Sequence, residues 1–166
     1  MAGEPIDNLA ADRAGKGARG MIDARFIGKE LPAFHATVEA GQLRFFAKVT
    51  GETDPLYSDE TVARDAGHPA LPIPPTFLFS LEFNQPSTEW RAELGIVPAR
   101  ILHGEQAFTY HRMAYAGDTL LFEGRIADIY EKKGGALEFI ERQTRVTNQR
   151  GEHIADLRTI LVHRNG

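Results

Sequence analysis

The chain has 166 residues, 42% of them hydrophobic and 25% charged, with a formal net charge of −4 and no cysteine. This length predicts one domain with a core of its own. The acidic balance excludes a basic surface of the kind that binds nucleic acid, and no apolar run reaches the roughly 18 residues that a membrane-spanning helix needs. The lack of cysteine excludes disulfides, thiolate metal sites and cysteine nucleophiles.

The first 20 residues are small, polar and charged, and they lack the apolar segment of a secretory signal. We therefore predict a flexible tail over residues 1–20, a single domain over residues 21–166 and a cytoplasmic location. No nucleic-acid partner and no membrane partner is expected.

Residues 34–51 are typical of a short extended piece followed by a helix. Thr37 can cap the helix with Glu39 in its first turn, and Gly51 suits a left-handed helix end. Apolar residues at three-residue intervals give this helix one buried stripe, made of Leu43, Phe46 and Val49.

Two further helices are predicted after an acidic turn. Ser58 is placed to open a short helix over residues 59–65. Pro75 suits the first turn of a strongly apolar helix from Thr76 to about Phe83. At about 1.5–3 kcal/mol for each large apolar side chain buried, this helix is expected to be the main nucleus of the core.

From residue 101 onwards the apolar period becomes two, which predicts antiparallel strands over residues 101–110, 120–132, 137–147 and 154–163. The third of these strands changes its apolar face near Phe139 and Ile140, which indicates a bulge. Alternation places His103 and Glu105 on one face of the first. Early helices and late strands predict an α+β fold, with a sheet edge or face free to pair with a second copy.

Four motifs taken together resemble the MaoC-like hot-dog dehydratases. They are Gly51-Glu52-Thr53-Asp54-Pro55-Leu56-Tyr57, Ile73-Pro74-Pro75-Thr76-Phe77, Leu102-His103-Gly104-Glu105-Gln106 through Arg112, and Ala116-Gly117-Asp118. The resemblance covers roughly residues 21–164 and is closer to the N-terminal type, which is related to the dehydratase of type I fatty acid synthases.

This resemblance implies a hot-dog fold, an antiparallel sheet of about five strands wrapped around a long central apolar helix. It also implies an acyl thioester substrate, carried on coenzyme A or on acyl carrier protein. The implied reaction is the reversible addition of water to a 2-enoyl thioester, which gives a 3-hydroxyacyl thioester.

The acidic loop departs from the family pattern Gly-Asp-x-Asn-Pro-aliphatic-His. Glu52 stands at the aspartate place, Asp54 at the asparagine place and Tyr57 at the histidine place. A phenol with a pKa near 10 shuttles protons poorly at neutral pH compared with an imidazole near 6.5. The chain therefore resembles the substrate-binding subunit of two-subunit (3R)-hydroxyacyl thioester dehydratases, in which a partner subunit performs the chemistry.

The candidate catalytic residues are Glu52, Asp54, Tyr57, His103 and Glu105. N–H groups at a helix start can stabilise a developing enolate oxygen. The candidate substrate-binding residues are therefore Pro74, Pro75, Thr76 and Phe77.

Each group has a second interpretation. The acidic residues of the loop can simply cap the turn and the helix that follows, and Tyr57 can be a packing residue. His103 and Glu105 can form an acid–base couple or a bond at a dimer interface. Together with His111 they match no familiar metal-ligand spacing, so we predict no metal and no cofactor.

The preferred hypothesis is a hydratase or dehydratase subunit that supplies the acyl-binding groove in a heterodimer with a catalytic MaoC-like hot-dog subunit. The second is a self-sufficient homodimeric hydratase that uses Glu52, or His103 with Glu105. A non-catalytic acyl-thioester scaffold and a hot-dog thioesterase are the alternatives from other classes.

Overall fold

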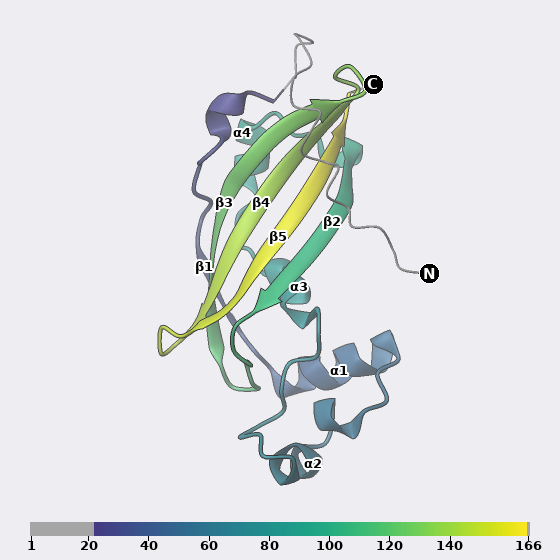
Figure 1. Cartoon of the computed structure of the whole chain (residues 1–166), viewed down its shortest axis with the longest axis vertical. Coiled ribbons are helices and arrows are strands. Elements are labelled where there is room, and N and C mark those ends of the chain that lie inside the picture. Colours follow the sequence, from purple (N-terminus) through teal and green to yellow (C-terminus); the bar gives the residue numbers. More distant parts are fainter. Residues whose placement is uncertain (1–21, 166) are drawn as a thin grey trace, which may run out of the picture.

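A computed structural model of the chain describes residues 22–165 and contains one five-stranded antiparallel sheet (Figure 1). The strands are β1 (Phe34–Thr37), β2 (Ile101–Tyr110), β3 (Thr119–Lys132), β4 (Leu137–Asn148) and β5 (His153–Arg164). Their order across the sheet is β1-β3-β4-β5-β2, so β1 and β2 form the two edges. The α+β prediction and the number of strands are confirmed, whereas the predicted tail lies outside the described residues.

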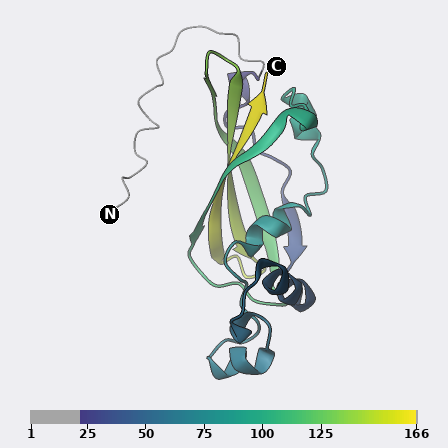
Figure 2. The ribbon, with the colours of Figure 1, turned by 90° about the vertical axis from the view of Figure 1, so that its right-hand side faces the viewer.

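The helices lie on one side of the sheet and below its lower end, as the view turned by 90° shows (Figure 2). They are α1 (Ala40–Thr50), α2 (Glu60–Asp65), α3 (Phe77–Glu82) and α4 (Glu89–Glu93), with 3₁₀ turns η2 (Ala24–Phe26), η3 (Pro55–Tyr57) and η4 (Pro98–Arg100). Within the described part of the chain, no helix is long and apolar enough to cross a membrane.

The central helix α3 is buried as predicted, but it is not long. It has six residues and buries Phe77, Leu78 and Leu81. Its start is fixed by two prolines and by Thr76, which has a left-handed backbone with φ of 70°. Pro86 follows closely after its end and cannot continue a helix. The expected long central helix is therefore wrong for this chain.

Two apolar clusters form the core. The larger surrounds α3 and includes Leu43, Leu78, Leu120 and Phe122. The smaller lies around α4 and includes Trp90 and Ile140. Burying such side chains contributes about 1.5–3 kcal/mol each, so α4 adds a second nucleus that the sequence analysis did not assign.

The starts of the first two helices differ from the predictions. Glu39, not Thr37, is the N-cap of α1, and it makes no side-chain cap bond. The helix buries Leu43 and Ala47, four residues apart, whereas Val49 is exposed. At 3.6 residues per turn, three-residue steps drift around the helix and carry position 49 away from the core.

The short helix α2 is capped by Asp59 rather than by Ser58. The Asp59 carboxylate accepts hydrogen bonds from the backbone N–H groups of Thr61 and Val62. Gly51 does end α1 in the left-handed conformation, with φ of 75°, as predicted.

The predicted bulge in β4 near Phe139 and Ile140 is wrong, because the nearest register shift lies in the facing strand β3, between Ile126 and Asp128. Every even-numbered residue of β4 is buried and its pairing is unbroken there. The buried face carries polar side chains as well as apolar ones, and these polar members are Glu138, Arg142, Thr144 and Asn148. Their polarity breaks the apolar alternation in the sequence without breaking the strand.

A bulge does occur in β2, at Gly104. His103 pairs with Leu161 and Glu105 pairs with Ile160, so two steps along β2 match one step along β5. Because directly paired residues share a face and adjacent residues do not, His103 and Glu105 lie on opposite faces. The prediction that they share a face is wrong.

Candidate functional site

The acidic loop after α1 uses its carboxylates to hold its own backbone. Glu52 accepts a hydrogen bond from the Asp54 N–H at 2.9 Å, and Asp54 accepts one from the Leu56 N–H at 2.9 Å. The second bond caps the 3₁₀ turn η3. This geometry matches the interpretation of both residues as turn caps.

Tyr57 is brought together with the two carboxylates, as the loop motif suggested. Burial raises the pKa of its hydroxyl, and the negative charges of Glu52 and Asp54 raise it further. A phenol in this setting stays protonated at neutral pH. It can donate a hydrogen bond, but it cannot serve as a general base.

The start of α3 lies beside α1. The ring of Phe46 packs edge-on against that of Phe77, with ring centroids 5.3 Å apart. Pro74 is buried, whereas Pro75 and Thr76 are exposed. The N–H of Phe77 already donates to the Pro74 carbonyl, and the N–H of Phe79 donates to the Thr76 carbonyl. Part of the expected set of free N–H groups is therefore engaged within the turn.

Tyr110 on β2 also reaches this start, which the sequence analysis did not assign. Burial raises the pKa of the Tyr110 hydroxyl, and a hydrogen bond with the Thr76 backbone opposes the rise. Its place on the helix-side face follows from the bulge at Gly104, because residues after the bulge keep an alternation that includes Tyr110 and Phe108.

His103 faces α3 from the edge strand. Its ring stacks on Phe79 with centroids 4.9 Å apart, and its Nε2 lies 3.3 Å from the Gln106 Oε1. These contacts lie on β2 and α3 rather than on the acidic loop. His103 therefore remains a predicted site residue with an aromatic neighbour.

Glu105 lies on the other face of the sheet. There it binds Arg158, whose guanidinium also meets Glu141 at 2.9 Å. These contacts cross three strands and stabilise the sheet surface. Because Glu105 and His103 lie on opposite faces of the sheet, they cannot both contact one substrate. The proposed acid–base couple therefore does not form within the described chain.

A buried ion pair lies at the far end of α3. Glu82 accepts a hydrogen bond from Arg142 at 2.7 Å and another from Thr144 at 3.3 Å. Burial raises the pKa of Glu82, although the charge of Arg142 lowers it in part. An acidic residue ending an apolar helix was the available sequence signal for this pair.

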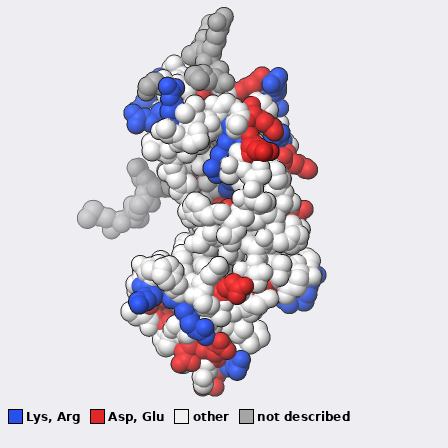
Figure 3. Space-filling model, turned by 180° about the vertical axis from the view of Figure 1, so that it is seen from behind, with Lys and Arg blue, Asp and Glu red and all other residues white. Residues whose placement is uncertain are grey.

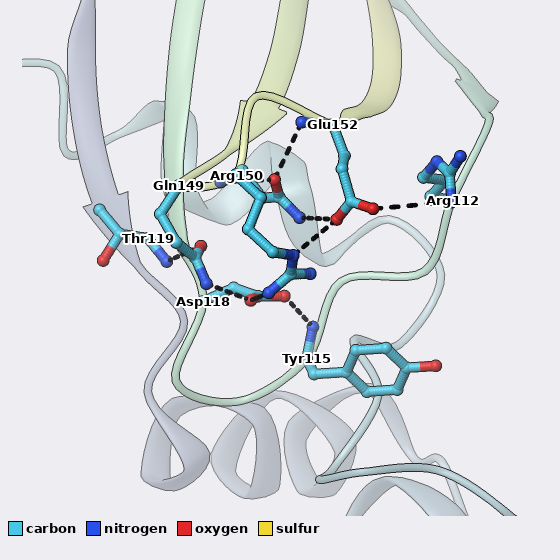
Figure 4. Close-up of polar contacts among 8 residues, drawn as sticks. Arg112, Tyr115, Asp118, Thr119, Gln149, Arg150 and Glu152 are labelled. Carbon is cyan, nitrogen blue, oxygen red and sulfur yellow. Dashed lines mark hydrogen bonds and ion pairs between the residues drawn. The ribbon is translucent and has the colours of Figure 1, made fainter.

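The Ala116-Gly117-Asp118 motif forms a structural turn (Figure 4). The buried Asp118 carboxylate accepts hydrogen bonds from the Tyr115 N–H and from the Gln149 side chain, both at 2.9 Å. Arg150 approaches it at 3.7 Å. This part of the resemblance therefore fixes the connection into β3.

Exposed apolar side chains occur on α1, just after α3, and along and just after β2. Among the described residues these include Phe83, with 76% of its surface exposed, Leu102, with 53%, and also Phe45, Val49, Tyr110 and Met113. The face seen from behind the sheet has few charged groups across its middle (Figure 3). By contrast, an open groove of about 710 Å³ on the other face of the sheet is lined by none of the predicted site residues.

The sequence profile described as "FAS1-like, dehydratase domain region" matches residues 25–157. The chain belongs to this family. It is a family of MaoC-like hot-dog dehydratases. The chain is 33% identical to the UPF0336 protein SCO4636 of Streptomyces coelicolor over 146 residues, which are 86% of this chain and 95% of that protein. A UPF0336 protein of Saccharopolyspora erythraea is also 33% identical, over 86% of this chain and 92% of its own.

Solved structures share the fold of this FAS1-like dehydratase-region protein. The C-terminally truncated HadBC (3R-hydroxyacyl-ACP dehydratase) complex of Mycobacterium tuberculosis matches with a TM-score of 0.70 and 26% identity, over 82% of this chain and 96% of that one. The R-hydratase PhaJ1 of Pseudomonas aeruginosa matches with a TM-score of 0.63 and 17% identity, over 84% and 83%. The hot-dog fold predicted by the motifs is confirmed.

Proposed function

We propose that this chain is the substrate-binding half of a two-subunit dehydratase that acts on 3-hydroxyacyl thioesters. In that reaction the C2–H proton and the C3 hydroxyl leave as water, and a C2=C3 double bond forms. A partner hot-dog subunit with an intact aspartate–histidine loop supplies the proton transfers. This chain supplies the apolar surface for the acyl group and the turn at the start of α3.

The observation that carries the proposal is the state of the acidic loop. Its carboxylates are bonded to backbone N–H groups, and the histidine place holds Tyr57, whose raised pKa keeps the phenol protonated. The chain thus presents a loop suited to shape a site rather than to move protons. The likeness to the HadBC complex supports a paired arrangement.

The partner is placed by this proposal at the edge strand β2. This strand pairs with β5 on one side only, and unpaired strand edges readily accept another chain. Exposed Leu102, Tyr110 and Phe83 lie on β2 and just beyond α3. A second subunit there would also stand beside Thr76, so the start of α3 would become part of a shared cleft.

The first test uses crotonyl-CoA with the pure full chain, followed by loss of the enoyl absorbance and by detection of free thiol. We expect no change in either channel for the chain alone. We expect hydration once a co-expressed hot-dog subunit with an intact loop is present. Hydration by the chain alone would overturn the two-subunit proposal, and thiol release would indicate a thioesterase instead.

Two substitutions refine this test. Glu52→Gln keeps the oxygen that accepts from Asp54, so the activity of the pair should stay within twofold of wild type. A loss of a hundredfold or more would make Glu52 a catalytic base and contradict the proposal.

Leu102→Lys should abolish co-purification with the partner, whereas Ile27→Lys, at an exposed apolar residue in the turn after η2, should not.

A further inference from the structure

Three potential metal ligands meet where β2 ends and β5 begins. His111 Nε2 lies 2.8 Å from Asp156 Oδ2, and His153 Nε2 lies 2.9 Å from Asp156 Oδ1. The two imidazole rings are 4.1 Å apart between centroids. One ligand atom from each residue falls within a group no wider than 4.8 Å.

The backbone fixes this arrangement. The N–H of His111 donates to the Ile154 carbonyl at 2.8 Å, which continues the β2–β5 ladder past the last strand pair. Asp156 pairs directly with Thr109, two residues before His111. Because residues two apart on a strand share a face, His111 stands next to Asp156, while His153 reaches the same carboxylate from within β5.

Asp156 supplies the negative charge of this group. Asp156 is a carboxylate at neutral pH, and neutral imidazoles are good ligands. The neighbouring Glu152 is held by Arg150 at 2.8 Å and approached by Arg112 at 3.7 Å (Figure 4). Arg150 and Arg112 therefore contact that second carboxylate, and the two imidazoles contact Asp156.

Two imidazole nitrogens with one carboxylate oxygen form a donor set that suits Zn²⁺ and related transition metals rather than Mg²⁺ or Ca²⁺, which prefer oxygen ligands. At ligand distances of about 2.0–2.2 Å, a tetrahedral Zn²⁺ ion takes three protein ligands and one water. His111 and Asp156 are exposed and His153 is half-buried, so an ion can enter and the side chains can adjust.

We propose that His111, His153 and Asp156 form a Zn²⁺ site on this protein, on the sheet surface and separate from the proposed acyl site. The ion links the segment that follows β2, which carries His111, to strand β5, which carries His153 and Asp156. Asp156 and Thr109 also line the open groove of about 710 Å³. The proposed site therefore adjoins that groove.

The other histidines do not offer an equivalent set. His163 is fully buried, His68 lies 3.3 Å from the Tyr115 hydroxyl, and His103 stacks on Phe79. His35 is exposed on β1 at the opposite edge of the sheet. It therefore serves as the control for removal of a surface imidazole.

The test is isothermal titration of the full chain, prepared without an affinity tag, with ZnCl₂. We expect one Zn²⁺ per chain for wild type. His111→Ala, His153→Ala and Asp156→Asn should each weaken binding at least tenfold, and His35→Ala should leave it within twofold. Co²⁺ should give the visible absorption of a four-coordinate site in wild type and not in Asp156→Asn.

Thermal melting without metal checks that the variants fold, and His111→Gln replaces His111→Ala if the latter does not. Zn²⁺ should raise the melting temperature of wild type but not of the three variants. The proposal is overturned if wild type binds no Zn²⁺ at millimolar concentration, if the three variants bind as wild type does, or if His35→Ala weakens binding equally.

Discussion

At the scale of single residues, Thr76 is the most unusual position of the site region. A β-branched residue with positive φ is a steric outlier, and Thr76 has φ of 70° at the N-cap of α3 without a side-chain cap bond. Such strain persists where the surrounding structure enforces it and is frequent at functional sites. Here the enforcing elements are the two preceding prolines and the contact between Thr76 and Tyr110.

Thr76→Gly should therefore raise the free energy of unfolding by about 1 kcal/mol, because glycine adopts positive φ without a Cβ clash. Urea denaturation of the full chain measures this change. Thr88 is the matched control, since it is the N-cap of α4, has φ of −116° and also lacks a side-chain cap bond. Thr88→Gly should alter stability by only a few tenths of a kcal/mol. Equal effects of the two substitutions would show that Thr76 carries no strain.

Glu82 leads to a prediction about pH. Burial raises the pKa of Glu82 above its ordinary value of 4.5, so the folded chain binds this proton more tightly than the unfolded chain does. Stability from this group is present below pH 4.5 and is lost as the pH rises through the raised pKa. The free energy of unfolding should be measured for wild type and Glu82→Gln at several pH values. As the pH rises, the wild-type value should fall relative to that of the variant.

Glu152→Gln supplies a control of opposite sign. Hydrogen bonds from Asn148 and Arg150 lower the pKa of Glu152. Its contribution is present above the ordinary value of 4.5 and is lost as the pH falls through the lowered pKa. On acidification, the free energy of unfolding of wild type should therefore fall relative to that of Glu152→Gln. The same direction for both variants would refute the assignment of Glu82.

At the scale of elements, the bulge in β2 decides which side chains face α3. A Cβ added at Gly104 would lie 2.8 Å from the Val162 Cγ2 and 3.2 Å from the Ile160 carbonyl oxygen. Gly104→Ala should lower the free energy of unfolding by about 1–3 kcal/mol through overpacking. Gly41→Ala, in α1 with open space around it, should instead raise it by about 0.5–1 kcal/mol. Thermal or urea unfolding distinguishes them, and a neutral Gly104→Ala would mean that the strand shifts without cost.

Sequence patterns predicted the elements that depend on local signals. The left-handed end of the first helix at Gly51 and the late strands were recognised from residue type and period. The bulge at Gly104 was missed because strict alternation also fits a strand without a bulge. The buried face of β4 was misassigned because Glu138 and Arg142 are buried with partners on other elements. Burial of polar residues by such distant partners does not appear in the apolar periodicity of the sequence.

The site shows the same division. The Glu52–Asp54–Tyr57 loop is local in sequence, and its turn-capping contacts could be anticipated from residue type. The grouping of His111, His153 and Asp156 depends on how β2 registers against β5. Periodicity alone does not give the register between two strands that are separated by two others in the chain. That grouping was therefore inaccessible from the sequence.

At the scale of the whole molecule, a buried polar cluster joins three distant parts of the chain. Glu138 on β4 accepts hydrogen bonds from the Ile22 N–H and the Asn165 side chain, both at 2.8 Å. It also lies 3.5 Å from His163, whose other ring nitrogen accepts from the Val97 N–H at 3.3 Å. This polar cluster connects the first described residues, the segment after α4 and the end of β5. It lies beside the smaller apolar cluster.

Glu138→Leu should therefore destabilise the fold by about 1–3 kcal/mol for each buried donor that loses its acceptor, namely the Ile22 N–H and the Asn165 side chain. Glu138→Gln retains one carbonyl oxygen for the Ile22 N–H and should cost less. The measurement is urea unfolding together with hydrogen exchange at the Ile22 and Val97 amides, both of which should lose protection in Glu138→Leu. Glu123→Leu, on the opposite sheet face, should change neither amide. Unchanged exchange at Ile22 in Glu138→Leu would show that the cluster does not hold this end of the molecule together.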